Sequence, residues 1–559
     1  LTFLSKEEIE ELEKKHTENP HLREAHKALA KEVITFLHGE EEYNKAVKIS
    51  ESLFSGDIKD LTLEEINDAF KDVPNFELKE ESLIDMLVNN KITSRDVDFA
   101  AWYTDVVNAA HLARYSNVKG CTIFEPNGCA LWESIKENMD KMFKETGHKN
   151  VMMPMFIPEN LLKKEGELVE GFAPEVAWVT IGGSKPLEEK LAVRPTSETL
   201  FSDYYRDVVK SYRDLPLKYN QWCSVVRWEK ETRPFLRSRE FFWQEGHTVH
   251  ATQIEAEKET HDMLNIYKKF FTDYLAVPVM SGRKTEKEKF AGAEYTLTIE
   301  ALMYNGICLQ SGTSHYFGQK FSKAYDIKFL NKDNNYEYAY QTSWGSSNRM
   351  IGAVIMVHGD DYGLVLPPKV APIKVDIIPI GSDISVSSAL EIIKTKLKEN
   401  NITVRVDDSE KSPGFKFAES EVNGTPIRIE MGTRDLENNE VTLVRRDSRE
   451  KITVKIEELL NKIEFLLEDI QNNLYKKALE RMNTLTYTAT NMDEMSSIIK
   501  QHPGFIKADW CGNTECEIKL KDKTGIKSRC ILENEEKITG KCAICGRPAK
   551  EVVVWGIQY

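Results

Sequence analysis

The stretch VVRWEKETRPFLRSREFFWQEGHTVH, residues 225–250, is the most informative part of this chain. Two apolar runs flank a polar segment containing Pro234, a pattern that predicts a β-hairpin with a long connection. Arginines stand near both strand ends, and a guanidinium keeps its charge and matches the geometry of phosphate oxygens. Phe241 offers a flat ring on which a nucleobase can stack. The segment therefore predicts an ATP site that lacks a glycine-rich phosphate loop.

The same hairpin resembles motif 2 of class II aminoacyl-tRNA synthetases. Within it, WQEGH at residues 243–247 resembles prolyl-tRNA synthetases, and the resemblance runs from about Phe99 to Tyr559. It implies an α+β catalytic domain built on an antiparallel sheet. It also implies activation of L-proline by ATP and Mg²⁺ to prolyl-adenylate, then transfer to tRNA(Pro). The stretch between His247 and Trp344 is too short for the editing domain that typical bacterial members insert there.

The resemblance distributes the ATP site over three segments. Arg227 and Arg349 are expected to be the catalytic arginines, because fixed cations must absorb the charge that develops on the α-phosphate. The other expected ATP residues are Glu229, Arg237, Ser238 and Phe241 on the hairpin, Gln310 and Thr313, and Ser347. Residues 339–372 place glycines before an apolar run, which predicts a buried central helix beginning at Arg349. For any one arginine a solvated hairpin is the favoured alternative, but the whole string indicates a site.

A proline pocket is expected around VRPTSETLFSDYY, residues 193–205. On a strand, Thr196 and Glu198 would point to the same side, where a hydroxyl and a carboxylate can hold the secondary ammonium of proline. The alternative is a capping box at the start of a helix. The resemblance adds five residues to this pocket, namely Arg227, Trp243, Glu245, His247 and His315.

Residues 373–472 read as a smaller α/β unit. The order strand, helix, strand predicts a mainly parallel sheet, and Pro413–Asp447 resembles the anticodon-binding domain of the same enzymes. The candidate residues for reading unstacked bases are Lys416, Glu430, Arg434 and Arg446. For each of them the alternative is an ordinary solvated charge.

Cys511, Cys516, Cys542 and Cys545 follow the spacing C-x4-C-x25-C-x2-C. Four thiolates close a tetrahedral site, so the pattern predicts structural Zn²⁺ with no open position; separate free thiols are the alternative. Cys530 is expected to be an unliganded thiol. The spacing is similar to that in the C-terminal domain of prolyl-tRNA synthetases of archaeal and eukaryotic type. The expected domains are therefore a catalytic domain at 97–372, an anticodon-binding domain at 373–472 and a zinc-binding domain at 473–559.

Residues 1–96 form a charged, helical segment in which Ser5 and Glu8 can make a capping box. Residues 38–61 resemble the part of bacterial tyrosyl-tRNA synthetases just after their catalytic domain, and 82–95 the start of their small RNA-binding module. A helical appendage without that ancestry is the alternative. Because the first residue is Leu1, we expect the chain to be trimmed or joined to a longer polypeptide.

Composition limits the partners of the chain. Its net charge is −15, so an RNA partner must meet local basic surface, and no DNA partner is expected. No apolar run approaches the roughly 18 residues of a membrane helix, and no signal peptide is evident, which predicts a cytoplasmic protein. Asn150–Leu162 resembles motif 1 of class II enzymes and predicts a homodimer.

Two alternative functions were weighed against the prolyl enzyme. A threonine-specific relative would hold a catalytic zinc with Cys and His ligands, a set that the central domain lacks. A regulatory paralogue without activity would be expected to lose the motif arginines, yet Arg227, Arg237 and Arg349 are present.

Overall fold

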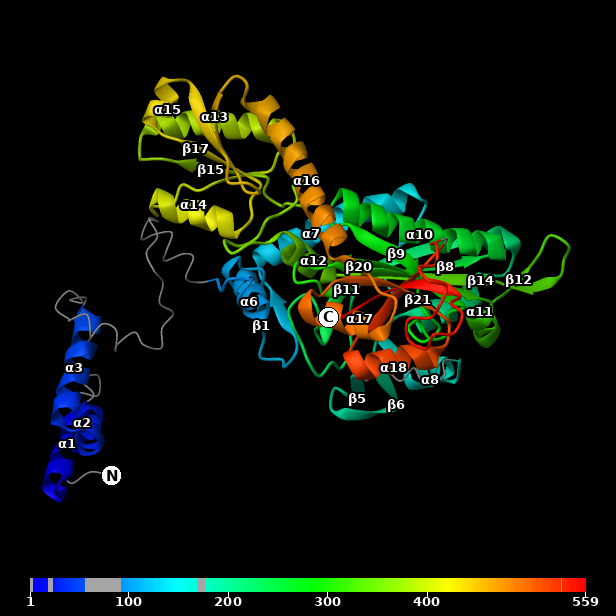
Figure 1. The fold of residues 1–559 in the computed structure, drawn as a ribbon, viewed down its shortest axis with the longest axis horizontal. Helices are drawn as coiled ribbons and strands as arrows, with labels where there is room; N and C mark the ends of the chain where they lie inside the picture. The colour runs from blue at the N-terminus through cyan, green and yellow to red at the C-terminus, as the bar shows by residue number, and fades with distance from the viewer. Residues whose placement is uncertain (1–3, 19–23, 56–91, 169–175, 534) are drawn as a thin grey trace. The chain divides into compact units, whose positions relative to one another are not determined.

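The computed structural model describes residues 4–18, 24–55, 92–168, 176–533 and 535–559. The chain separates into two compact units, Leu1–Ser82 and Leu83–Tyr559. The described part of the first unit consists of α1 (Lys6–Glu18), α2 (Glu24–His38) and α3 (Glu40–Ser55), drawn in blue in Figure 1. The predicted capping box is confirmed, because the Glu8 N–H donates to Ser5 Oγ at 3.3 Å and the Ser5 N–H donates to Glu8 Oε2 at 2.7 Å.

The segments that resemble tyrosyl-tRNA synthetases, residues 38–61 and 82–95, fall partly within residues 56–91, which lie outside the described residues. The prediction for these segments stays a prediction.

An eleven-stranded sheet organises the second unit, in the order β20-β21-β23-β22-β9-β10-β11-β14-β8-β7-β3. Neighbouring strands are antiparallel except in the two outermost pairs, β20–β21 and β7–β3, which confirms the predicted antiparallel sheet. The edge strand β3 (Lys149–Asn150) is followed across the sheet by β7 (Leu217–Val226), β8 (Glu240–His250), β14 (Tyr340–Ser347), β11 (Cys308–Gly318), β10 (Tyr295–Leu302) and β9 (Val279–Arg283).

The predicted hairpin is present. β7 and β8 pair from Leu217↔Val249 to Val226↔Glu240, and residues 227–239 form the long connection. The helix α10 (Gln253–Asp273) packs across β8, β10, β11 and β14. The helix α12 (Arg349–His358) begins at Arg349 as predicted, and every residue from Met350 to His358 is buried.

Smaller elements surround this sheet. The helices are α6 (Phe99–Ala109), α7 (Pro126–Glu145), α8 (Glu159–Leu168), α9 (Glu198–Val208) and α11 (Lys320–Tyr325), with the 3₁₀ turn η3 (Tyr212–Asp214). The strands pair as β1 (Ala113–Tyr115) with β2 (Thr122–Phe124), β12 (Lys328–Leu330) with β13 (Tyr336–Tyr338), and β4 (Phe156–Pro158) with β6 (Lys185–Val193) and β5 (Trp178–Gly182).

The five-stranded unit that follows has the strand order β16-β15-β17-β18-β19. Its elements are β15 (Val375–Pro379), α13 (Ile384–Glu399), β16 (Val404–Val406), α14 (Pro413–Val422), β17 (Ile427–Met431), α15 (Thr433–Glu437), β18 (Glu440–Arg445) and β19 (Lys451–Lys455). The first three strands in the order are parallel, but β17–β18 and β18–β19 are antiparallel. The prediction of a mainly parallel sheet was therefore wrong for half of the pairings, because β18 and β19 follow through short connections.

The helix α16 (Leu459–Thr484) leads into the C-terminal region, which contains β20 (Thr486–Thr488), α17 (Met492–Gln501), β21 (Phe505–Trp510), α18 (Thr514–Thr524), β22 (Lys527–Leu532) and β23 (Glu551–Gly556). Its strands continue the central sheet, since β22 lies beside β9 with Ile531 opposite Arg283. Gly282 permits this approach, because an added Cβ would lie 2.2 Å from the Ile531 carbonyl oxygen. No pattern in the sequence indicated this shared sheet.

No helix within the described ranges is both long enough and apolar enough for a membrane crossing.

Candidate active site

A cavity of about 380 Å³ lies over the central strands of the large sheet. Twelve of the predicted site residues line it, namely Thr196, Glu198, Arg227, Phe241, Trp243, Glu245, His247, Gln310, Thr313, His315, Ser347 and Arg349. They come from β8, β11 and β14, from the start of α12, and from two segments that border these strands. Residues more than 150 positions apart in the sequence therefore share one wall.

Three predicted ATP residues, all in the described part of the chain, do not line this cavity. Glu229, Arg237 and Ser238 lie on the connection between β7 and β8. The Ser238 hydroxyl donates to the Glu240 carbonyl oxygen at 2.6 Å, while the Arg237 side chain is exposed. Arg237 still influences the cavity, because its charge is one of the causes that lower the pKa of Arg349.

Arg227 and Arg349 gather positive charge at one end of the cavity. Burial, followed by the charges of Arg237 and Arg227, lowers the pKa of Arg349 to about 10. Burial also lowers the pKa of Arg227, against the charges of Glu198 and Glu245. The Arg227 guanidinium carbon lies 5.4 Å from the centre of the Phe241 ring. Two buried guanidinium groups whose pKa values are lowered in this way favour binding of an anionic ligand such as a polyphosphate.

Glu245 also lines the cavity and is buried. Its Oε1 accepts hydrogen bonds from Ser197 Oγ, at 2.5 Å, and from Gln221 Nε2, at 2.6 Å. Its Oε2 lies 3.0 Å from His247 Nε2. Burial alone would raise the pKa of Glu245, but the hydrogen bonds and the charge of His247 outweigh it, so the pKa is lowered. The carboxylate is therefore held ionised.

Thr196 and Glu198 were predicted to lie on a strand, but the structure places them at the start of α9. The helix begins at Glu198, and its N-cap Ser197 makes no side-chain capping bond. Even so, the two predicted side chains meet, because the Thr196 hydroxyl donates to Glu198 Oε2. Ser343 Oγ donates to the other carboxylate oxygen at 3.2 Å.

Two histidines close this polar end. The His247 ring stacks on Phe201 with their centres 4.2 Å apart. Burial lowers the pKa of His315 to about 3, so this ring is neutral at physiological pH. His315 Nδ1 lies 2.9 Å from the Thr296 hydroxyl, and the Phe290 ring lies 4.8 Å from the His315 ring. This part of the cavity suits a ligand with a cationic nitrogen, which would lie beside the carboxylates of Glu198 and Glu245 and near the aromatic rings.

Several residues of this site were not singled out from the sequence. Ser197, Gln221, Phe290, Thr296 and Ser343 touch the predicted residues or line the cavity. Ser197 lies within the quoted motif, so its proximity to Thr196 was a usable signal. Gln221 and Phe290 carried none, because their contacts depend on how distant strands pair.

The four base-reading candidates have different surroundings. Arg434 is exposed. Lys416 and Glu430 are buried, and they contact Asp407 and Arg428. These three lie within the five-stranded unit, whereas the fourth candidate is placed differently.

Arg446 is also held within the protein. Its guanidinium is buried and forms two hydrogen bonds to Asp360, at 2.8 and 2.5 Å. Asp360 follows the end of α12, so Arg446 joins the five-stranded unit to the central domain. A role of Arg446 in reading bases stays a prediction.

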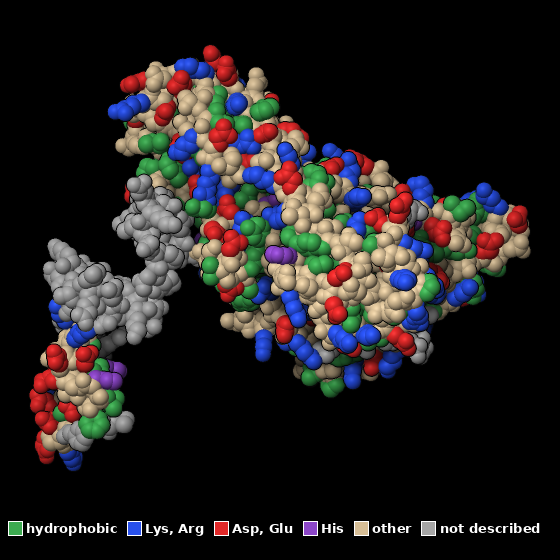
Figure 2. Space-filling view, in the orientation of Figure 1, with side chains coloured by type: hydrophobic (Ala, Val, Ile, Leu, Met, Phe, Trp, Pro, Cys, Tyr) green, Lys and Arg blue, Asp and Glu red, His purple; other side chains and the backbone are tan. Residues whose placement is uncertain are grey.

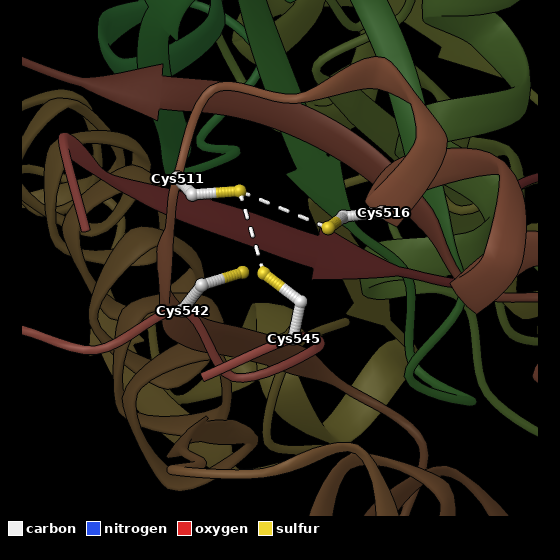
Figure 3. Close-up of side chains that lie close together, drawn as sticks. All are labelled: Cys511, Cys516, Cys542 and Cys545. Atoms are coloured by element: carbon white, nitrogen blue, oxygen red, sulfur yellow. Dashed lines mark hydrogen bonds between the residues drawn. The ribbon is translucent and has the colours of Figure 1, made fainter. Parts of the chain in front are cut away.

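The four predicted cysteine ligands converge. Their sulfur atoms all lie within 4.8 Å of one another, and Figure 3 shows them facing a common centre. Cys511 Sγ lies 3.7 Å from both Cys516 Sγ and Cys545 Sγ. Zn–S bonds of about 2.3 Å in a tetrahedron require sulfur atoms roughly 3.8 Å apart, so the donor set fits Zn²⁺. Cys530 lies outside the cluster, and burial raises its pKa to about 12.

Comparison with known proteins gives three family matches along the chain. Residues 178–358 match the class II tRNA synthetase core domain of the G, H, P, S and T enzymes, and residues 374–466 match an anticodon binding domain. Residues 492–559 match a family described as prolyl-tRNA synthetase, C-terminal.

Curated relatives are similar over most of the chain. A proline–tRNA ligase of Lachnospira eligens is 58% identical over 470 residues, which cover 84% of this chain and 98% of the relative. Proline–tRNA ligases of Clostridium novyi and Ruminiclostridium cellulolyticum are 56% and 54% identical, with the same shares covered. These relatives are bacterial, so the expected archaeal and eukaryotic type is not confirmed. With identity at this level along nearly the full length of the relatives, the chain belongs to the prolyl-tRNA synthetase family.

Proposed function

We propose that the 380 Å³ cavity is where this proline–tRNA ligase joins proline to ATP and then passes the prolyl group to tRNA(Pro). One observation carries the proposal. Two arginines, Arg227 and Arg349, here called the cationic end, and two carboxylates, Glu198 and Glu245, here called the carboxylate end, line the same cavity. Proline and ATP carry the complementary charges.

The cationic end takes ATP. Arg227 meets the α-phosphate and the proline carboxylate, while Arg349 and the exposed Arg237 meet the outer phosphates with Mg²⁺. Phe241 stacks on the adenine, and Glu229 contacts its amino group. The remaining ATP contacts are Ser238, Gln310, Thr313 and Ser347.

The carboxylate end takes proline. Thr196 and Glu198 bind the secondary ammonium, and their mutual hydrogen bond sets their orientation. Glu245 and His247 complete the polar wall, with Trp243 and His315 closing the pocket around the ring. The proline carboxylate then attacks the α-phosphate, and pyrophosphate leaves. No covalent enzyme intermediate is needed, because placement and cationic stabilisation supply the acceleration.

Substitution of Arg227 tests the assignment. Arg227→Ala should abolish proline-dependent ATP–pyrophosphate exchange, because the developing charge on the α-phosphate loses its nearest cation. Arg213→Ala, at an exposed arginine on η3, is the matched control and should exchange like wild type. Exchange by Arg227→Ala at the control's rate would remove Arg227 from the site.

Cysteine should be activated as well as proline. An apolar pocket rejects a smaller amino acid by only roughly 1–3 kcal/mol per missing methylene, and the chain has no inserted editing domain. We expect cysteine-dependent exchange above background, measured with purified enzyme at high cysteine concentration. Exchange equal to that of a reaction without amino acid would contradict the expectation.

The C-terminal domain is proposed to bind structural Zn²⁺ through Cys511, Cys516, Cys542 and Cys545. The convergence of the four sulfur atoms supports this, as does the spacing shared with members of archaeal and eukaryotic type. Domain boundaries of 97–372, 373–472 and 473–559 are proposed with it, and the three family matches lie within these ranges. Residues 1–96 are proposed as an accessory segment.

A homodimer is proposed through the motif 1 segment. Met152, Met155 and Phe156 are exposed there, and Trp178 and Ile181 are exposed on β5, which belongs to the same three-stranded sheet as β4. Met152 has 96% of its surface exposed. Exposed apolar groups that gather in this way mark an association surface.

The tRNA is proposed to meet the five-stranded unit through Lys416, Glu430 and Arg434. Figure 2 shows Lys and Arg side chains interspersed with Asp and Glu over the visible face. Recognition of an anticodon would therefore rest on local contacts and little on a broad basic field. Since tRNA charging serves translation, we propose that the enzyme works in the cytoplasm.

A further inference from the structure

Glu517 of the C-terminal domain reaches directly into the central domain. It is buried, and it follows the cluster residue Cys516 on α18. Glu517 Oε1 accepts hydrogen bonds from Ser528 Oγ in its own domain and, at 3.1 Å, from Thr285 Oγ1 in the central domain. The two hydroxyls are 3.3 Å apart, and both residues are buried. One carboxylate oxygen therefore spans the boundary between the domains.

Thr285 is the second residue of the connection between β9 and β10, whose first part is here called the 284–290 loop. Its carbonyl oxygen accepts the N–H groups of Glu288, at 3.1 Å, and Lys289, at 2.9 Å. Thr285 therefore anchors the turn that presents Glu288, Lys289 and Phe290 to the cavity. Any displacement of Thr285 moves this wall of the cavity.

The far end of the loop meets the proposed proline pocket. The Phe290 N–H donates to Thr296 Oγ1 at 3.0 Å, and the same hydroxyl lies 2.9 Å from His315 Nδ1. The Phe290 ring lies against the His315 ring. The loop thus sets the position of the residues around His315. These contacts of the loop are with the proposed proline pocket and not with the arginines.

A second contact ties the loop to the same domain. Lys284 Nζ lies 2.6 Å from Glu300 Oε1, and Arg529 Nη1 of β22 lies 3.7 Å from Glu300 Oε2. All three side chains are buried. Lys284 and Thr285 are consecutive, so the C-terminal domain holds the start of the loop both directly and through Glu300.

We propose that Glu517 is a positioning residue that holds the 284–290 loop at the proline end of the cavity, so that the C-terminal domain completes the amino-acid pocket. The inference rests on the proposed pocket. It extends that proposal, because it gives the C-terminal domain a part in substrate binding that is separate from its own folding. A buried carboxylate and its donors lose free energy when one partner is removed, so the bond between Thr285 and Glu517 fixes the loop.

The experiment compares two hydroxyls that donate to the same oxygen. Thr285→Val removes the bond between the domains at nearly constant shape, whereas Ser528→Ala removes only the bond within the C-terminal domain. Proline-dependent exchange by the full chain gives the KM for proline, the KM for ATP and kcat. We expect Thr285→Val to raise the KM for proline roughly five- to tenfold, the size of one lost buried hydrogen bond. The KM for ATP of Thr285→Val should stay within about twofold of wild type. The KM for proline and the KM for ATP of Ser528→Ala should do the same.

Conservative variants separate positioning from general damage. Thr285→Ser and Glu517→Gln keep a donor and an acceptor at the boundary, so both should bind proline like wild type, whereas Glu517→Leu should reproduce Thr285→Val. Circular dichroism and thermal unfolding establish that each variant is folded.

Two results overturn the inference. One is a KM for proline of Thr285→Val and Glu517→Leu within twofold of wild type, and the other is an equal rise in the KM for ATP. Absence of proline-dependent exchange in the wild type would instead remove the proposed pocket, and this inference with it.

Discussion

Glu259 of α10 is a buried carboxylate that ties three parts of the central domain together. Its Oε1 lies 2.7 Å from His148 Nε2, just before β3, and its Oε2 lies 2.5 Å from Lys218 Nζ on β7. Burial alone would raise the pKa of Glu259. The hydrogen bonds and charges of His148 and Lys218 outweigh it and lower the pKa to about 2. The ionised form therefore stabilises the fold beneath the active-site sheet.

The stability that Glu259 contributes should depend on pH. Its folded-state pKa is depressed, so the contribution is complete above the ordinary value of 4.5 and is lost as pH falls toward about 2. Glu259→Gln should be less stable than wild type at pH 7 by roughly 2–4 kcal/mol. The difference should shrink by about 2 kcal/mol between pH 6 and pH 3. Urea unfolding across this range measures it, and a difference that stays constant would contradict the assignment.

The packing around Gly246 explains why the WQEGH motif has a glycine at this position. It pairs with Trp344 across β8 and β14, and an added Cβ would lie 2.1 Å from the indole ring. The Trp344 ring also packs against Phe143 and His148. Moving the indole aside to make room for a Cβ would therefore disrupt these contacts.

Gly246→Ala should therefore destabilise the fold by roughly 1–3 kcal/mol through overpacking. Gly345→Ala, where the nearest atom would be 3.3 Å away, is the matched control and should lose less. Urea unfolding of both variants tests this, and equal losses would show that the indole is not the obstacle.

The elements that the sequence predicted correctly are those whose pattern is local. The hairpin of β7 and β8 follows from two apolar runs and a Pro-containing connection. The helix α12 follows from glycines, an arginine and an apolar run. In both, neighbouring residues determine the conformation, so no knowledge of distant partners was needed.

Elements whose form depends on distant strands were predicted less well. Thr196 and Glu198 were expected on a strand, yet they meet at the start of α9. Serine, threonine and glutamate favour helix starts, and that alternative described the backbone better, although the side chains converge as expected. The pairing of β22 with β9 arises from contact between segments far apart in the sequence.

The site shows the same division. Residues within motifs, such as Arg227, Glu245 and His315, could be placed in one cavity from a family resemblance. Gln221 and Thr285 could not, because each acts through a partner on another strand or in another domain. The contact of Arg446 with Asp360, 86 positions away, could not be predicted for the same reason.

The second compact unit is joined through its C-terminal region, whose strands extend the central sheet. The cysteine cluster sits in that region, with Cys511 after β21, Cys516 on α18, and Cys542 and Cys545 on the segment before β23. A metal bound there would crosslink the segments that carry Glu517 and β22. Its loss should therefore loosen the edge of the sheet as well as the cluster itself.

Zinc analysis tests this arrangement. We expect the purified chain to carry about one Zn²⁺, the capacity of a single four-sulfur site. A strong chelator should lower its unfolding temperature, because binding free energy at a structural site is folding free energy. Cys542→Ser should lose the metal and unfold at the temperature of the chelated wild type. Cys530→Ala is the control, since the Cys530 thiol is buried away from the cluster, and it should retain zinc. A wild-type protein that holds no zinc when refolded with excess metal, or a Cys542→Ser variant that keeps it, would show that the four thiols are not the ligands.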